Sequence, residues 1–426
     1  MAPTTPRIDW IRQFGNGSQT IPLGGVATDR WGNAYVSGET YGAFPGASNA
    51  GDGDVFVAKY DSSGNQLWIR QFGTNERDQA LGTATDPSGN VYVAGWTRGT
   101  LAGQASAGGV DAFVAKYNPA GNQLWIRQFG TPSDEAANDV VVDAWGNAYV
   151  AGSARGVFPG QTSAGRGDAF IAKYDGGGNQ LWVREFGTPS FDTVYGLAVD
   201  KLGNLYLAGE TEGTLPGQVA GGLRDLFVGK YDSAGNQLWI RQLGTSTDDA
   251  AFDVAVDGSG NACLGGFTRG AFAGQTSAGS FDALVARYDP SGNQLWIRQF
   301  GTQGGEGASR VVADVAGNTY LAGRTSGTFP GQSSSGFEDV FVTRFNKAGK
   351  QRWVRQFGTL GGDDVFGLAG HGRHSLYVTG LTTGTFSGQV STGAVDAYLT
   401  RVTFGSNRLA WCRRPVHRLI RLILRR

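Results

Sequence analysis

Residues 131–187 read TPSDEAANDVVVDAWGNAYVAGSARGVFPGQTSAGRGDAFIAKYDGGGNQLWVREFG, and close copies of this unit fill most of the chain. Each copy carries the motif Trp-Ile/Val-Arg. The tryptophans of the motif are spaced by 58 residues once and by 57 thereafter, at Trp10, Trp68, Trp125, Trp182, Trp239, Trp296 and Trp353. A fixed period of this length is typical of a propeller or a solenoid.

Four short segments of the unit have the composition of β-strands, at 137–143, 148–152, 168–174 and 180–186. They are rich in Val, Ile and aromatic residues, which suit a pleated surface, and no part of the unit shows helical periodicity over ten residues. The motif Asp-x-x-Gly-Asn joins the first two strands, as in Asp143–Asn147, and the same turn chemistry joins the last two. Seven such units predict an all-β fold, a seven-bladed β-propeller of four-stranded antiparallel blades, with a solenoid as the alternative.

The two ends of the repeat array predict how the ring closes. The chain begins with a strand of the fourth type, Ile8–Phe14, whereas the last unit ends after its third strand, at Asp396–Arg401. We therefore predict that the N-terminal strand completes the last blade and hides two sheet edges. Trp411 lies 58 residues after Trp353 and competes for the same place.

The recurring phrases also resemble a known family. GNQLWIRQFGT (64–74), DAFVAKY (111–117) and GNAYVAG (146–152) are similar to the bacterial SBBP repeat, which is named for a seven-bladed β-propeller, and the resemblance covers residues 10–404. It implies the propeller fold and no common chemistry. We expect residues 1–404 to form one propeller of seven repeats of about 57 residues, followed by a separate tail at 405–426.

The chain is formally neutral, but its charge is unevenly distributed. Residues 405–426 hold seven arginines and no acid, which leaves 29 basic against 36 acidic residues in the propeller body. This excess of acid argues against nucleic-acid binding by the propeller. The tail segment 416–426 has the pattern of a basic amphipathic helix that touches an anionic membrane or an acidic partner. An inert end and a reading-frame accident are the alternatives.

Targeting signals and cysteines say little about the compartment. The N-terminus lacks the apolar region of a signal peptide, and no run of 18 apolar residues occurs, so the chain as written is expected in the cytoplasm. The family resemblance would allow an extracellular or cell-surface role. We interpret Cys263 and Cys412 as free thiols, because two cysteines do not make a disulfide framework.

Two residues recur in all seven units and are expected to be structural. The first is the aspartate that begins the third strand, and the second is the arginine two places after the repeat tryptophan, such as Arg127. We expect this arginine to lie against the next blade, where it either pairs with a carboxylate or packs on an aromatic ring.

A third acidic position falls between the fourth strand and the next first strand. It holds a carboxylate in six units, at Asp78, Glu135, Asp192, Asp249, Glu306 and Asp363. If the first strand is innermost, these acids surround the mouth of the central channel, where close like charges raise pKa values or recruit a cation. The hypothesis is a Ca²⁺ site, and the alternative is that each acid accepts hydrogen bonds at its own blade edge.

The position after the second-strand glycine differs between units and so offers an asymmetric binding surface. We select Glu39, Trp96, Glu210, Phe267 and Arg324 as candidate ligand-binding residues, since aromatic rings stack on sugars or apolar partners and arginine holds anions. These positions belong to the face that carries the longer connections, where function usually resides. Ordinary surface variation is the alternative.

No catalytic motif stands out from the repeat, and no metal-ligand spacing involves the cysteines. The sequence therefore favours a non-catalytic recognition or scaffold propeller, expected as a monomer, that binds a protein or glycan partner through its long-loop face, with Ca²⁺ as the candidate cofactor. The alternative is a propeller enzyme, a carboxylate-based glycosidase or lyase, with its site at the central channel.

Overall fold

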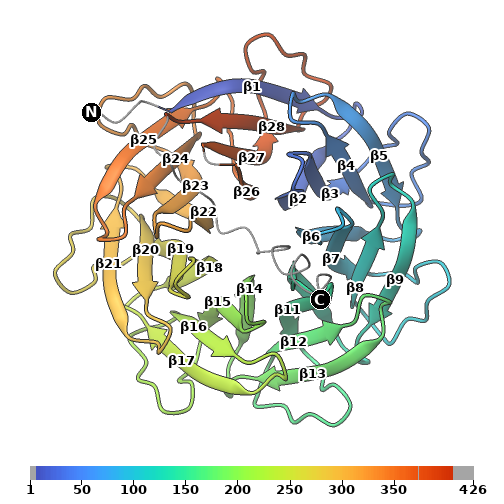
Figure 1. The fold of residues 1–426 in the computed structure, drawn as a ribbon, viewed down its shortest axis with the longest axis horizontal. Helices are drawn as coiled ribbons and strands as arrows, with labels where there is room; N and C mark the ends of the chain where they lie inside the picture. The colour runs from blue at the N-terminus through green and yellow to red at the C-terminus, as the bar shows by residue number, and fades with distance from the viewer. Residues whose placement is uncertain (1–5, 373, 406–426) are drawn as a thin grey trace, which may run out of the picture.

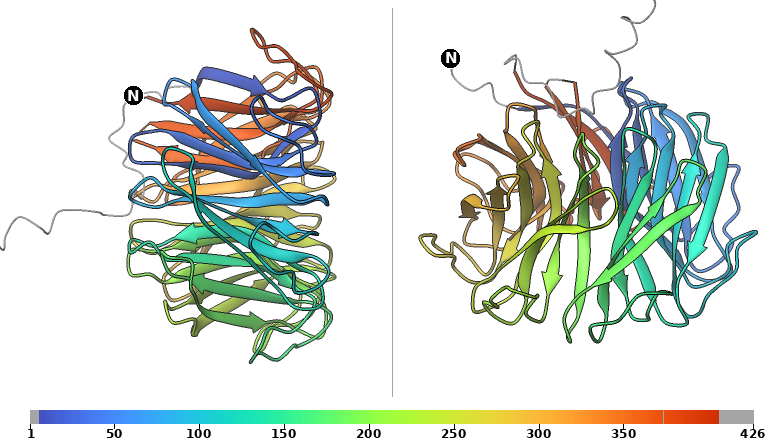
Figure 2. Two further views of the ribbon diagram at one scale, coloured as in Figure 1. Left: turned by 90° about the vertical axis from the view of Figure 1, so that its right-hand side faces the viewer. Right: turned by 60° about the horizontal axis from the view of Figure 1, so that its bottom comes forward.

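Seven four-stranded antiparallel sheets form a closed ring in the computed structural model, which describes residues 6–372 and 374–405 (Figure 1). The first strand of each sheet faces the centre of the ring and the fourth strand forms its rim. Seen from the side, the ring is a thick disc with connections on both faces (Figure 2). Among these residues, no helix is long and apolar enough to cross a membrane.

The strands fall into four sets according to their place in the blade. The innermost strands are β2 (Thr20–Thr28), β6 (Asp78–Thr85), β10 (Glu135–Val142), β14 (Asp192–Val199), β18 (Asp249–Val256), β22 (Glu306–Ala313) and β26 (Gly367–His371). The second strands are β3 (Ala34–Thr40), β7 (Val91–Thr97), β11 (Ala148–Ala154), β15 (Leu205–Thr211), β19 (Ala262–Thr268), β23 (Thr319–Thr325) and β27 (Ser375–Thr382). The third strands are β4 (Asp54–Tyr60), β8 (Asp111–Tyr117), β12 (Asp168–Tyr174), β16 (Asp225–Tyr231), β20 (Asp282–Tyr288), β24 (Asp339–Phe345) and β28 (Asp396–Thr403). The outermost strands are β5 (Gln66–Phe72), β9 (Gln123–Phe129), β13 (Gln180–Phe186), β17 (Gln237–Leu243), β21 (Gln294–Phe300), β25 (Gln351–Phe357) and β1 (Arg7–Phe14).

We number the blades in chain order, so that blade 1 contains β2–β5 and blade 7 contains β26–β28 together with β1. The predicted propeller and its four strands per unit are confirmed, and the observed bounds in blade 3 agree with the predicted bounds to within two residues. The solenoid alternative is wrong, because the first and last strands lie in one sheet.

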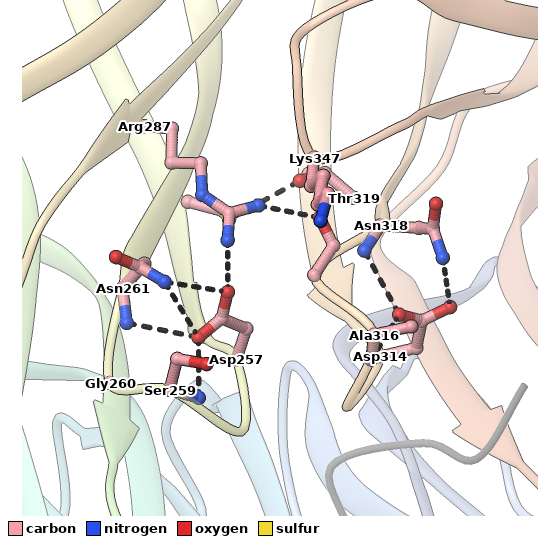
Figure 3. A network of polar contacts seen from close by, with 12 residues as sticks. Asp257, Ser259, Gly260, Asn261, Arg287, Asp314, Ala316, Asn318, Thr319 and Lys347 are labelled. Atoms are coloured by element: carbon pink, nitrogen blue, oxygen red, sulfur yellow. Dashed lines mark hydrogen bonds and ion pairs between the residues drawn. The ribbon is translucent and has the colours of Figure 1, made fainter.

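The turn that joins the first two strands works as its residues predicted. In blade 3, Asp143 Oδ1 accepts the backbone N–H groups of Trp145 and Asn147, both at 2.9 Å. Gly146 adopts φ 87°, which a residue with a side chain rarely takes. Figure 3 shows the same turn in blade 5, where Asp257 binds Ser259 and Asn261 and also forms an ion pair with Arg287 from β20. In blades 1 to 6, one aspartate thus closes the turn between the first two strands.

The N-terminal strand closes the ring, as predicted. The sheet of blade 7 has the order β1-β28-β27-β26, and β1 pairs with β28 from Arg7 opposite Thr403 to Phe14 opposite Ala397 (Figure 1). The competing Trp411 and the whole tail after Gly405 lie outside the described residues, so the interpretation of the tail stays a prediction.

The hydrophobic core lies between blades, and in five of the seven repeats the tryptophan and arginine are hydrogen-bonded to the hairpin of the next blade. Trp125 Nε1 donates to Gly176 O at 3.1 Å, and Arg127 Nε donates to Gly178 O at 2.8 Å, both in the hairpin of the following blade. The guanidinium carbon of Arg127 lies 5.7 Å from the centre of the Trp125 ring. The arginine therefore lies at the predicted place and packs on an aromatic ring, while its hydrogen-bond partner is a backbone carbonyl.

Blade 6 lacks this connection, because β28 and β1 of blade 7 are not joined by a hairpin. Phe404 packs there instead, with its ring centre 5.7 Å from that of Trp353. Arg355, which occupies the position of Arg127, has no hydrogen-bond partner at Nε among the described residues. Blade 6 is thus an internal comparison for the contact that Arg127 and its equivalents in four other blades make.

Alternation of strand direction gives the ring two different faces. The turns between strands one and two and between strands three and four lie on one face, which we call the hairpin face. The connections between strands two and three and from strand four to the next strand one lie on the other, which we call the long-loop face. On the hairpin face, Trp145 and Leu202 are each 68% exposed at turns.

Candidate functional site

The six acids proposed for Ca²⁺ are buried at the long-loop face, at or beside the start of the innermost strands. Each accepts hydrogen bonds from the backbone N–H and the hydroxyl of a threonine four residues earlier; for Glu135 and Thr131 both distances are 2.6 Å. Burial raises the pKa of Glu135, against the effect of these bonds. Every acid of the set is therefore already engaged at its own blade edge, as the alternative interpretation expected.

Each of these acids also lies close to an aspartate of the preceding blade. Asp111, which begins β8, adds to the raised pKa of Glu135, and Gly130 separates the two carboxylates. Within residues 6–372 and 374–405, no group of three or more histidine, cysteine, aspartate or glutamate side chains is arranged to hold a metal ion. The Ca²⁺ hypothesis stays a prediction from the sequence.

The five candidate ligand-binding residues do not form one site. They belong to three separate clusters on the long-loop face, each between two blades. Between blades 1 and 2, Glu39 is buried and accepts hydrogen bonds from Arg77 Nε and Nη2, at 3.0 and 2.8 Å. Trp96 Nε1 donates to Gln79 at 3.1 Å, and the guanidinium carbon of Arg77 lies 5.5 Å from the ring. Glu39 and Trp96 are thus held by the same arginine.

The second cluster lies between blades 4 and 5 and is half polar and half aromatic. Glu210 accepts a hydrogen bond from Tyr195 at 3.0 Å and forms an ion pair with Arg224 at 3.3 Å. Burial raises the pKa of Glu210, although Arg224 opposes the shift. Phe267 stacks on Phe252 with ring centres 5.5 Å apart. Tyr195 and Phe252 are themselves in contact, so the two halves are continuous.

The third cluster lies between blades 6 and 7 and is the most exposed. Arg324 Nη1 lies 3.3 Å from Glu338 Oε2 and 3.7 Å from Asp364 Oδ2. The neighbouring side chains Phe337 and Leu360 are 84% and 86% exposed on the connections beside it. Two large apolar side chains in water next to a charged cluster are typical of a contact surface for another molecule. We call these five residues the blade 6–7 patch.

Six charged residues line the central channel, of which Asp29, Arg30 and Asp86 belong to hairpin turns and Asp139, Asp253 and Arg310 to the innermost strands. A cavity of about 550 Å³ runs between the innermost strands of all seven blades, and Asp139, Asp253 and Arg310 line it together with Tyr195 and Phe252. They occupy one structural position, directly after a β-bulge in β10, β18 and β22. A bulge changes the direction in which the next side chain points, and here it directs charged groups to the channel.

Each aspartate of the channel binds backbone N–H groups from two blades. Asp139 accepts hydrogen bonds from Val140 in its own strand and from Leu197 in β14, both at 2.8 Å. Asp253 does the same with Val254 at 2.8 Å and with Val311 in β22 at 2.9 Å. These contacts connect blade 3 to blade 4 and blade 5 to blade 6.

The two carboxylates stay hard to ionise in spite of these donors. Burial and the charge of Asp253 raise the pKa of Asp139 to about 7. Burial raises the pKa of Asp253 to about 6, while Arg310 lowers it. Arg310 itself donates to the carbonyl of Ser309 at 2.8 Å, and no carboxylate lies within 4 Å of it among the described residues. The channel therefore holds negative charge that is only partly balanced.

A signal for these residues was present in the sequence. The position reads Gly25, Gly82, Asp139, Gly196, Asp253, Arg310 and Gly367 around the ring, which is glycine in four blades and charged in three. The variation at the end of the second strand, which holds Glu39 and Trp96, therefore has a counterpart in the first strand. The bulge adds a residue that strand alternation does not reveal, so the direction of these side chains was hidden as well.

Comparison with known families identifies the repeat. A family model described as a β-propeller repeat, SBBP, matches residues 9–45, 67–101, 124–159 and 181–215. The regulatory protein FlaEY of Caulobacter vibrioides is 25% identical over 380 residues, which is 85% of this chain and 36% of FlaEY. An uncharacterized WD repeat-containing protein, L264, of Acanthamoeba polyphaga mimivirus is 27% identical over 170 residues, 33% of this chain and 12% of that protein. The chain thus spans about a third of FlaEY and about an eighth of L264.

Solved structures with a similar fold are distant in sequence. A chain of the mitotic checkpoint complex has a TM-score of 0.50 and 12% identity, over 87% of this chain and 91% of that chain. The β-propeller domain of the Trilobed protease from Pyrococcus furiosus has a TM-score of 0.48 and 9% identity, over 90% and 94% of the two chains. At such identities the first likeness shows the fold alone.

Proposed function

Since the chain is built from SBBP β-propeller repeats, we propose that it is a non-catalytic scaffold that binds a protein partner through its long-loop face. The observation that carries the proposal is the blade 6–7 patch: Phe337, Leu360 and Arg324 are exposed together on a frame whose other parts repeat from blade to blade. Apolar side chains beside an arginine are typical of the residues that contribute most to protein interfaces.

The other two clusters support the same proposal. The clusters between blades 1 and 2 and between blades 4 and 5 carry different side chains at equivalent positions, so the long-loop face has no seven-fold symmetry. A partner that reads an asymmetric surface binds in one orientation. The regulatory role in the name of FlaEY is in keeping with a protein that acts through contacts, although FlaEY is much longer than this chain.

The test compares two double variants of the purified chain in affinity capture from a cell extract, with cross-linking and mass spectrometry to map the contact. Phe337→Ser/Leu360→Ser changes the blade 6–7 patch, and Trp145→Ser/Leu202→Ser is the matched control on the hairpin face. All four side chains are exposed, so both variants are expected to fold with an unchanged melting temperature.

We expect a captured protein to cross-link to the long-loop face, and its affinity to fall at least about tenfold in the patch variant, which corresponds to about 1.4 kcal/mol, and to stay unchanged in the control. Loss of binding in the hairpin-face variant alone would show that the wrong face was chosen. If a glycan array gives binders whereas no protein depends on the patch, the partner is a carbohydrate and the proposal is wrong.

A further inference from the structure

The central channel carries charge that the architecture of the ring does not require. At the position after the bulge, a β-carbon on Gly82 would lie 2.7 Å from Val140 N, and one on Gly196 would lie 2.6 Å from Asp253 Cα. The neighbouring backbone therefore favours glycine there, and four blades have it. Blades 3, 5 and 6 depart from glycine, and in each case the replacement is charged.

A structural role explains these charges only in part. Asp139 and Asp253 satisfy N–H groups of neighbouring blades, but the four blades with glycine close the ring without such a carboxylate. Arg310 bonds only a carbonyl of its own strand among the contacts of the described residues. Its guanidinium acts electrostatically on both Asp139 and Asp253 while pairing with neither.

We propose that the channel is a binding site for a small zwitterion that carries an ammonium and a carboxylate group, as a free amino acid does. The ammonium group lies with Asp139 and Asp253, and the carboxylate lies with Arg310. Tyr195 and Phe252 line the same cavity and offer an apolar surface to the rest of the molecule. The site shares no residue with the blade 6–7 patch, although the charge of Arg310 also lowers the pKa of Asp364 in that patch, and this inference goes beyond the proposed scaffold function.

Charge and size together select this class of ligand. On the innermost strands, a simple anion would meet Asp139 and Asp253, and a simple cation would meet the field of Arg310, whereas a molecule with both charges is attracted by all three groups. Asp29, Asp86 and Arg30 also line the cavity, and the two aspartates are held by backbone N–H groups of their own turns. Burial also makes the carboxylates of Asp139 and Asp253 resist ionisation, and an ammonium group beside them would relieve that cost. The cavity volume of about 550 Å³ lies within the range of about 300–1,000 Å³ that is usual for small-molecule sites.

The experiment is a thermal-shift screen of the full chain with the twenty amino acids, followed by calorimetry. Phenylalanine is compared with phenethylamine, which lacks the carboxylate, and with 3-phenylpropionate, which lacks the amine. We expect at least one amino acid to raise the melting temperature, and each analogue of a binder that lacks one charged group to bind at least about tenfold more weakly.

Variants assign the roles of the residues. Arg310→Gln and Asp139→Asn are each expected to weaken binding at least about tenfold, because each leaves one charge of the ligand without its partner. Arg310→Gln should disturb the fold less than Asp139→Asn, because Arg310 donates one hydrogen bond to its own strand whereas Asp139 connects two blades. Phe337→Ser/Leu360→Ser is the matched control and should bind the amino acid as the wild type does, which separates the failure of this inference from that of the scaffold proposal.

Three outcomes would overturn the inference: no amino acid shifts the melting temperature, Arg310→Gln binds like the wild type, or the amine alone binds as tightly as the zwitterion. Affinity should also fall as the pH is lowered from about 8 to about 5, because protonation of Asp139 and Asp253 removes the charge that attracts the ammonium group. Affinity that rises on acidification would contradict the assigned orientation.

Discussion

Single glycines decide whether neighbouring blades can meet at the long-loop face. Gly130 lies between Asp111 and Glu135, which come from two blades, and a β-carbon there would overlap Asp111 Oδ1 and lie 2.6 Å from Glu135 Oε2. Neither carboxylate can easily move, because each is hydrogen-bonded and buried. The glycine is required by this close approach, since its φ is not in the left-handed region.

Replacing this glycine should destabilise the ring. We expect Gly130→Ala to lower the free energy of unfolding by about 1–3 kcal/mol, as overpacking of a close contact usually does. Gly307→Ala is the matched control, because a β-carbon on Gly307 meets no atom within 4 Å. Urea unfolding followed by tryptophan fluorescence measures both; equal stability of the two variants would contradict the argument.

At the scale of the element, the outermost strand of one blade is fastened to the hairpin of the next. Arg127 in β9 makes this contact through Gly178 O, whereas Arg355 in β25 finds no such hairpin in blade 7. The chain therefore contains the same residue at the same position with and without its partner. Comparison of the two arginines gives the contribution of this hydrogen bond to the free energy of unfolding.

The two arginines should respond differently to truncation. We expect Arg127→Ala to cost about 1.5–3 kcal/mol of stability, the range for a hydrogen bond from a charged group, and Arg355→Ala to cost clearly less. Chemical denaturation of both variants gives the two values. A loss in Arg355→Ala as large as in Arg127→Ala would mean that packing on tryptophan, and not the carbonyl of the next blade, supplies the stability.

Strands, turns and ring closure were predictable from sequence because each rests on a local pattern. Segments rich in Val, Ile and aromatic residues placed β12 and β13, and Asp-x-x-Gly-Asn placed the turn at Asp143. The candidate site was less predictable. Glu39 and Trp96 were candidates because their position differs between blades, but their contact with Arg77 joins two blades and has no local signature. Asp139 needed the bulge of β10, which alternation does not reveal.

On the scale of the whole molecule, the buried acids make the ring sensitive to pH. Asp139 has a pKa of about 7 and Asp253 of about 6, and the pKa values of Asp78, Asp192, Asp249 and Asp363 are also raised by burial. For these groups the folded state holds protons that the unfolded chain has released. Their contribution to stability is therefore present at low pH and is lost as the pH rises through the folded pKa values.

The melting temperature should accordingly rise when the pH is lowered from about 8 to about 5.5. Exposed turn acids with lowered pKa values, such as Asp175 and Asp289, have the opposite effect on stability. They exert it only near the ordinary pKa of a carboxyl group, which lies below this pH range. Asp139→Asn should reduce the rise, because it removes a carboxyl group whose pKa is raised to about 7. Differential scanning calorimetry measures the effect, and a melting temperature that falls over this range would contradict it.

The strand that closes the ring, β1, has nearly the same sequence as several other outermost strands. RIDWIRQF of β1 shares WIRQF with β5, β9 and β21, so this motif does not distinguish blade 7 from blades 1, 2 and 5. It reaches β28 because every other third strand is already covered by the strand that follows it in its own hairpin. A second copy with its seam open presents the same uncovered edge. Two open rings can thus exchange their first strands, and β1 then pairs with the β28 of the other copy in the same way. The short connection between β1 and β2 favours the closed monomer, because it keeps the effective concentration of β1 near its own β28 high.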